Sequence, residues 1–110
     1  EEKIGTLQKQ QDVIDVLQGD SVSMEIQGVR IGDAVFITSS AEILTETGLQ
    51  VKSSSPIEHT FIASIANGYL HYAPPASYYP GAAYEAIECL MSPEWEAAFM
   101  DTASAILSRL

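Results

Sequence analysis

The stretch GVRIGDAVFIT, residues 28–38, decides the fold of this chain. Gly32 and Asp33 lie between two segments rich in β-branched and aromatic residues, and a glycine in the first position of a two-residue turn suits type II′. The run AVFI, residues 34–37, is apolar at every position, which is typical of a strand covered on both faces. The stretch therefore predicts a β-hairpin whose second strand is central in a sheet.

The sequence before this hairpin turn divides into a helical and an extended part. Residues 1–18 carry apolar side chains at helical spacing, which predicts an amphipathic helix that ends at a glycine. In residues 21–27, apolar and polar residues alternate, as in a half-buried strand, and Gly28 is a candidate bulge position. Residues 21–38 as a whole are thus expected to form one antiparallel hairpin.

The sequence after the hairpin alternates between helix and strand signals. Ser39 and Glu42 have the spacing of a capping box, which predicts that a helix starts directly after the hairpin. Residues 60–66 are an apolar run with strong β propensity, and the Asn-Gly pair that follows indicates a turn. Residues 69–72 are expected to form a short strand or an extended segment.

A second clear helix start lies near the C-terminal end of the sequence. Ser92 suits the N-cap position and Pro93 the first helical position, so the pattern predicts a helix over residues 93–108. Trp95 and Phe99 follow at helical spacing, and large aromatic residues in such a stripe are expected as core anchors, with a binding surface as the alternative.

The order of these elements predicts an α/β fold in which layered helices cover a small mixed sheet that contains a β-hairpin. Residues 1–110 are expected to form a single compact segment. The chain offers three main helices and few strands, while its apolar central strand needs cover on both faces. Part of that cover is therefore expected from outside these elements.

Composition narrows the classes of partner. The formal net charge is -10, with 15 acidic and 5 basic residues, which argues against nucleic acid because such binding requires Lys and Arg to neutralise phosphates. The same charge disfavours adsorption to an anionic membrane surface. No apolar run approaches the roughly 20 residues of a transmembrane segment. Cys89 is the only cysteine, so the chain forms no internal disulfide.

Polar and aromatic side chains gather where two predicted strands end. Residues 67–72, NGYLHY, follow one apolar strand, and Glu42 follows another. Ligand sites in open α/β sheets lie at the carboxyl ends of strands, so these residues are expected to converge on one pocket. The alternative for Glu42 is a purely structural role in the capping box. His59 and His71 are too far apart in sequence for a zinc-binding His pair on one helix.

The order of features from residue 26 to residue 85 resembles the C-terminal part of the N-terminal catalytic domain of neutral/alkaline ceramidases. The quoted segments are RIGD at 30–33, SAE at 40–42, HTFI at 59–62, ANGYLHY at 66–72 and GAAYE at 81–85. In the family, the segment equivalent to residues 40–42 has the sequence Pro-Gly-Glu. The resemblance implies that the chain is part of a larger αββα-type domain and that the helix at 93–110 fits the end of that domain.

The resemblance also implies a chemistry. The family consists of zinc amidases that split ceramide into a fatty acid and a sphingoid base, and two of the zinc ligands correspond by position to Glu42 and Tyr72. Zinc would acidify a water molecule that attacks the amide. The resemblance further suggests a secreted or periplasmic location. Other residues expected to line the site are Asn67, Tyr69, His71 and Tyr84.

The chain departs from the family pattern in ways that leave two functions open. Ser40-Ala41 replaces Pro-Gly, Ala82-Ala83 replaces Gly-Gly, and the family's histidine ligands lie upstream of the matching region. The first hypothesis is a fragment or shortened relative of a ceramidase-like amide hydrolase acting on lipid N-acyl linkages. Such a chain would be inactive and would not bind zinc tightly alone, and the remainder of the catalytic domain would be supplied in cis or in trans. The second is a non-enzymatic module that keeps the fold and binds a ligand or partner.

Overall fold

The structure, a computed structural model, describes residues 8, 11 and 21–110 of the chain. The amphipathic helix expected over residues 1–18 therefore lies outside the described residues, apart from Gln8 and Gln11, which are helical and exposed.

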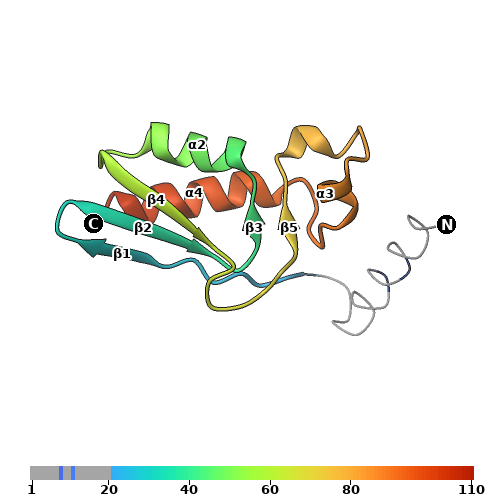
Figure 1. The fold of residues 1–110 in the computed structure, drawn as a ribbon, viewed down its shortest axis with the longest axis horizontal. Coiled ribbons are helices and arrows are strands. Elements are labelled where there is room, and N and C mark those ends of the chain that lie inside the picture. The colour runs from blue at the N-terminus through green and yellow to red at the C-terminus, as the bar shows by residue number, and fades with distance from the viewer. Residues whose placement is uncertain (1–7, 9–10, 12–20) are drawn as a thin grey trace.

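The described residues form strands and helices in an alternating order (Figure 1). In chain order they are β1 (Gly28–Ile31), β2 (Ala34–Ser39), β3 (Glu42–Ile43), α2 (Thr45–Ser54), β4 (His59–Ser64), β5 (Tyr72–Ala73), the 3-10 helix η1 (Ala76–Tyr78), α3 (Tyr84–Ile87) and α4 (Trp95–Leu107). The short helices η1 and α3 follow the Pro-Pro pair at residues 74–75.

The main sheet is mixed, with the strand order β1-β2-β4. β1 and β2 pair antiparallel as the predicted hairpin, while β2 and β4 pair in parallel and are joined by a crossover that contains α2. β3 and β5 form a second, two-stranded sheet that lies between the main sheet and α3 (Figure 1). The predicted α/β class with helices on a small mixed sheet is confirmed.

The hairpin turn has the predicted backbone geometry. Gly32 has a φ of +63°, whereas Asp33 does not have a positive φ. A positive φ in only the first central position is the feature of a type II′ turn, and glycine adopts it without a steric penalty.

The first strand of the hairpin is shorter than expected, and the prediction of a strand over residues 21–27 is wrong. The ladder ends because the backbone N–H of Gln27 donates to the side-chain oxygen Oγ1 of Thr38, 2.8 Å away, instead of to a backbone carbonyl. Burial still alternates along residues 21–27, with Met24 and Ile26 packed against the core. The period-two pattern therefore predicted correctly which side chains point toward the core, although residues 21–27 do not form a hydrogen-bonded strand.

Gly28 was expected as a bulge, and that prediction is also wrong. It pairs in regular register with Ile37. A Cβ atom at Gly28 would lie 2.2 Å from Cγ2 of Ile106 and 2.9 Å from Cδ1 of Leu110. The glycine is thus required by the close approach of the C-terminal end of the chain to β1, rather than by the shape of the strand.

The capping box predicted at Ser39 and Glu42 does not form. The hydroxyl of Ser39 is buried, where it donates to the carbonyl of Ala41 and accepts from the N–H of Ala41. The backbone N–H of Glu42 donates to the carbonyl of His71, 2.8 Å away, so Glu42 is a strand residue. Helix α2 begins at Thr45, without a side-chain cap.

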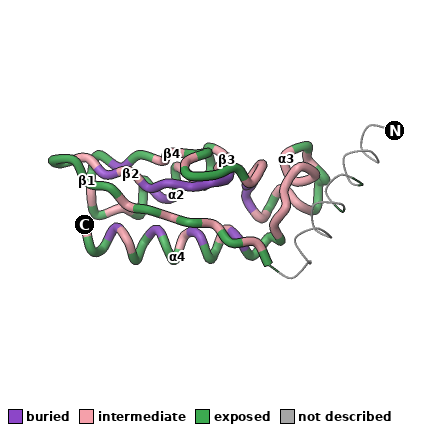
Figure 2. Tube along the Cα trace, turned by 90° about the horizontal axis from the view of Figure 1, so that it is seen from below, coloured by how far each residue is buried: buried purple, intermediate pink, exposed green. Residues whose placement is uncertain are grey.

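Helices α2 and α4 cover one face of the main sheet. Val35 and Ile37 of β2 point to this face and are 0% exposed, and they pack in one core with Val51 of α2 and Phe99 of α4. Figure 2 shows α4 as a layer along the sheet, with buried positions recurring on the side that faces the strands. The opposite face of β2 carries Phe36, which is only half-buried, so the expectation of cover on both faces holds for one face among the described residues.

The C-terminal helix starts two residues later than expected. Trp95 is its first residue and Glu94 its N-cap, and the Glu94 side chain accepts no hydrogen bond from a backbone N–H of the helix. The Ser92 hydroxyl instead hydrogen-bonds the Glu94 carboxylate, which lowers the pKa of Glu94. The predicted core role of Trp95 and Phe99 is confirmed, because they are 7% and 1% exposed and their ring centroids lie 5.9 Å apart.

Among the described residues, no helix combines the length and the apolar composition needed to cross a bilayer.

Candidate functional site

The candidate site lies where the parallel strands β2 and β4 end. Their last paired residues are Ser39 and Ser64, and the chain continues from them into β3 and β5, which pair in parallel again. In that second pairing Glu42 lies directly opposite Tyr72. Neighbouring strands are about 4.8 Å apart and paired side chains point to the same face, so the carboxylate and the phenol are neighbours.

The connection from β4 to β5 has a strained backbone. Ile65, Asn67 and His71 have φ values of 56°, 62° and 56°, in the left-handed region that L-residues rarely adopt. The connection from β2 to β3 consists of residues 40–41, whereas the connection from β4 to β5 consists of residues 65–71. The longer connection must fold back so that Tyr72 lies opposite Glu42. The positive φ values provide that reversal, and such strain concentrates at functional sites.

Hydrogen bonds tie this connection to the segment that carries Glu42. The N–H of Ala66 donates to the carbonyl of Ser39, and the N–H of Leu70 donates to the carbonyl of Ser40, each over 2.9 Å. At Gly68, whose φ is +155°, a Cβ would lie 3.2 Å from Oγ of Ser40. The two backbones thus fix the relative position of Glu42 and Tyr72.

Acidic neighbours control the ionisation of Tyr72. Repulsion from the Glu42 carboxylate is the largest cause that raises the pKa of Tyr72, followed by burial and by Tyr84, Glu85 and Tyr69. A phenolate beside a carboxylate is disfavoured in the absence of a cation. A metal ion held by Glu42 and Tyr72 would reverse this effect, because its positive charge would stabilise both anions.

Replacing Glu42 with glutamine is expected to lower the pKa of Tyr72 towards the ordinary tyrosine value near ~10, because the largest cause of the increase is removed. NMR titration of the Tyr72 ring in the metal-free chain measures this shift. Glu46→Gln is the matched control, since Glu46 accepts a hydrogen bond from Tyr78 and does not contribute to the pKa of Tyr72. An unchanged titration of Tyr72 in Glu42→Gln would show that the two groups do not interact.

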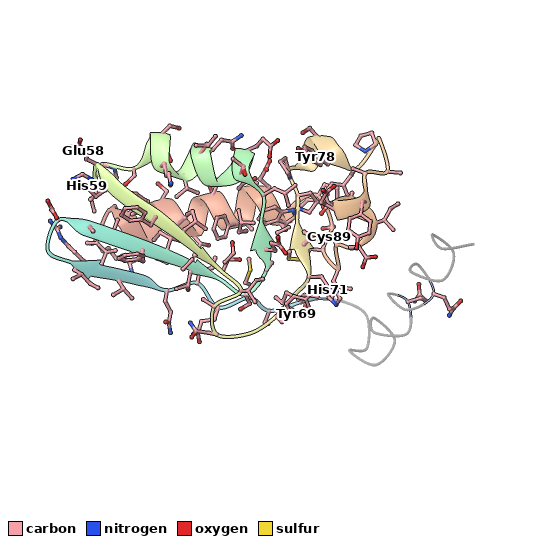
Figure 3. The ribbon with its side chains drawn as sticks, in the orientation of Figure 1. Glu58, His59, Tyr69, His71, Tyr78 and Cys89 are labelled. Atoms are coloured by element: carbon pink, nitrogen blue, oxygen red, sulfur yellow. The ribbon has the colours of Figure 1, made fainter. Side chains whose placement is uncertain are left out.

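The other predicted lining residues are brought together only in part. The ring of Tyr84 contacts Tyr72 edge-on, with centroids 5.8 Å apart. The rings of Tyr69 and His71 lie 4.8 Å apart on the segment that leads into β5 (Figure 3). Asn67 is exposed, and its amide donates to the side chain of Gln27, 3.2 Å away. Tyr84 thus lies against the Glu42–Tyr72 pair, whereas Asn67 bonds away from it.

One residue near the site was not among those predicted. Glu85, in the first turn of α3, adds to the negative potential that raises the pKa of Tyr72. The signal was present in the sequence, because Glu85 follows Tyr84 directly, but only the docking of α3 next to β5 brings it near Tyr72.

The donor set suits a hard or borderline cation but is incomplete. Glu42 and Tyr72 offer a carboxylate and a phenol oxygen as partners in β3 and β5. Within residues 8, 11 and 21–110, no group of three or more His, Cys, Asp or Glu side chains is placed to hold a metal ion. Catalytic zinc usually has three protein ligands, so a zinc ion held by these two residues would need at least one further ligand.

Comparison with known proteins identifies the fold. No protein-family model matches the chain, and no curated protein matches it. Solved structures do match, among them a ceramidase complexed with C2, 29% identical, and the neutral ceramidase from Pseudomonas aeruginosa, 26% identical, each with a TM-score of 0.65. The chain resembles part of a neutral ceramidase.

Each match covers 77% of this chain but only 15% of the ceramidase chain. The resemblance suggested by the order of sequence motifs is thus confirmed by the fold. The chain therefore corresponds to a small part of these enzymes. In this chain, the parallel pairing of β3 with β5 brings Glu42 and Tyr72 together.

Proposed function

We propose that this chain contributes one part of a zinc-dependent, ceramidase-like amide hydrolase that acts on a lipid N-acyl linkage. The observation that carries the proposal is the pairing of Glu42 with Tyr72 in a fold that matches neutral ceramidases. These two residues would supply two oxygen ligands, and the remainder of the catalytic domain, in cis or in trans, would supply the others. Zinc bound there would act as a Lewis acid in amide hydrolysis.

The residues of this chain have defined roles in that proposal. Glu42 would hold a negative charge at the site, and Tyr72 would lose its proton when a cation is present. The backbone bond from Glu42 to the carbonyl of His71 keeps the two donors in register. The rings of Tyr72 and Tyr84 form an apolar wall next to the oxygens, which suits a substrate with an alkyl chain.

The proposal is tested by complementation. The probe is Pseudomonas aeruginosa neutral ceramidase lacking the segment that this chain matches, mixed with the purified chain and assayed for release of fatty acid from ceramide. We expect activity that requires both polypeptides and that a zinc chelator removes. Glu42→Gln and Tyr72→Phe should each lower it at least about tenfold, since even outer-shell changes at metal sites have effects of that size.

A second carboxylate–phenol pair in the same chain is the control. Tyr78 donates a hydrogen bond to Glu46 over 2.6 Å, and neither residue is a strand partner of Glu42 or Tyr72. Glu46→Gln and Tyr78→Phe should leave the complemented activity unchanged. Calorimetry of the chain alone should show only weak zinc binding. Submicromolar binding that is lost in Glu42→Gln would point to further ligands within the chain, with His71 the first to test.

The alternative is a non-enzymatic module that keeps the fold. The observation that favours it is at Ala82, which has a φ of +48° where the family has glycine. A side chain in this conformation costs about 1–2 kcal/mol relative to glycine, so the turn before Tyr84 has lost its best residue. A stable complex between the chain and the truncated ceramidase that does not hydrolyse ceramide would support this alternative.

A further inference from the structure

The connection from β4 to β5 contains a chemically reactive pair of residues, Asn67 and Gly68. Asn67 is the only asparagine in the sequence, and a glycine follows it directly. An asparagine side chain is attacked most readily by the next backbone nitrogen when the next residue is glycine, because glycine has no Cβ that hinders the approach. Both residues are exposed, so water reaches the pair.

The backbone nitrogen of Gly68 is available for this attack. Within the described residues its N–H donates no hydrogen bond, whereas the N–H groups of Ala66 and Leu70, on either side, donate to Ser39 and Ser40 over 2.9 Å. These two flanking bonds hold the ends of the turn, and residues 67–69 between them are exposed. Figure 1 shows the connection as a wide loop between β4 and β5.

A single side-chain hydrogen bond holds the amide of Asn67. Its Nδ2 donates to Oε1 of Gln27, 3.2 Å away, and Nε2 of Gln27 donates in turn to Oε1 of Glu25, 2.7 Å away. Both bonds are exposed to solvent. An exposed hydrogen bond exchanges easily with water and contributes little net free energy, so it does not prevent the Asn67 side chain from turning toward Gly68.

We propose that Asn67 is a site of spontaneous deamidation in the folded chain, and that the reaction loosens the connection between β4 and β5. The backbone nitrogen of Gly68 loses its proton and attacks Cγ of Asn67. The new C–N bond closes a succinimide ring, and the bond from Cγ to Nδ2 breaks, so that Nδ2 leaves as ammonia. Water then opens the ring at either carbonyl and gives isoaspartate or aspartate.

Both products change the contacts of this connection. The new carboxylate only accepts hydrogen bonds, so it replaces the amide donor that faced Oε1 of Gln27 and adds a negative charge near Glu25. Isoaspartate also places an additional methylene group in the main chain between the two flanking bonds. Because these bonds fix the connection to the end of β2, we expect the longer main chain to weaken them. The inference does not depend on the proposed function.

The first test incubates the full chain in mildly alkaline buffer and follows Asn67 by peptide mapping with mass spectrometry. We expect the gain in mass that accompanies replacement of an amide NH2 by OH, together with released ammonia. The rate in the folded chain should be within tenfold of the rate in the same chain unfolded in urea. Asn67→Gln is the matched control, because its side chain would have to form a larger ring; it should release ammonia at least tenfold more slowly.

The second test measures hydrogen exchange by NMR in the purified isoaspartate product. The amide protons of Ala66 and Leu70 should exchange at least tenfold faster than in the fresh chain, because both are donors of the flanking bonds. The indole N–H of Trp95, which donates to the carbonyl of Pro74, should exchange at an unchanged rate.

Two results would overturn the proposal. If Asn67 stays unmodified in the folded chain but deamidates in urea, the fold protects the pair and the site does not exist in the native protein. If the isoaspartate product forms but Ala66 and Leu70 exchange as in the fresh chain, the reaction does not loosen the connection.

Discussion

Replacing Trp95 with alanine is expected to lower the free energy of unfolding by about 3–5 kcal/mol, which is the range for removal of a large buried aromatic side chain. Trp95 is 7% exposed and contacts Phe99 with ring centroids 5.9 Å apart. Its indole N–H also donates to the carbonyl of Pro74, 2.9 Å away, which ties α4 to the end of β5. The loss therefore combines a cavity with an unpaired buried carbonyl.

Urea denaturation followed by circular dichroism measures this loss. Trp95→Phe should cost less than Trp95→Ala, because it keeps most of the ring volume and loses the bond to Pro74. Leu49→Ala is the surface control, since Leu49 is 58% exposed and should change stability by at most about 0.5 kcal/mol. A loss below about 1 kcal/mol for Trp95→Ala would mean that this side of α4 is not buried.

Replacing Gly28 with valine is expected to destabilise the chain by roughly 1–3 kcal/mol or more, because added atoms in a filled core force neighbours to move. The new Cβ would lie 2.2 Å from Cγ2 of Ile106, a methyl group attached directly to the branched Cβ. Because β-branched side chains are stiff at χ1 in a helix, this methyl group cannot move away unless α4 moves. The additional methyl groups of valine increase the overlap. The interface between β1 and α4 is therefore expected to open first.

The control for this prediction is the glycine in α2. Gly48→Ala would place its Cβ 3.7 Å from the nearest side-chain atom, on Ile62, which is an ordinary contact. An alanine in a helix is favoured over glycine by about 0.5–1 kcal/mol, so this variant should be more stable than the unmodified chain. Equal stability of Gly28→Val and the unmodified chain would show that α4 does not pack against β1 at this position.

Local patterns in the sequence were sufficient for several elements. The hairpin turn at Gly32, the strand around residues 60–66 and the terminal helix each depend on neighbouring residues, whose backbone preferences act over short distances. The core role of Trp95 and Phe99 follows in the same way from helical spacing. The ceramidase resemblance also came from the order of segments along the chain, and the matching structures confirm it.

Tertiary contacts decided the points at which local patterns were wrong. Ser39 and Glu42 have the spacing of a capping box, but Ser39 is buried at the end of β2 and the N–H of Glu42 is taken by His71. Gly28 resembles a bulge residue in sequence, but the structure requires glycine there because Ile106 of α4 leaves no space for a Cβ atom. These partners are separated by many residues in the chain, and a local pattern carries no information about them.

The candidate site shows the same division. The sequence alone supplied the residue types, with Glu42 and Tyr72 each following an apolar strand. Their alignment as partners in β3 and β5 depends on the parallel pairing of β2 with β4 and on the strained turn at residues 65–71. Only the assembled fold brings Glu85 and Tyr84 near the phenol, because electrostatic interactions depend on distance in space and not on separation along the chain.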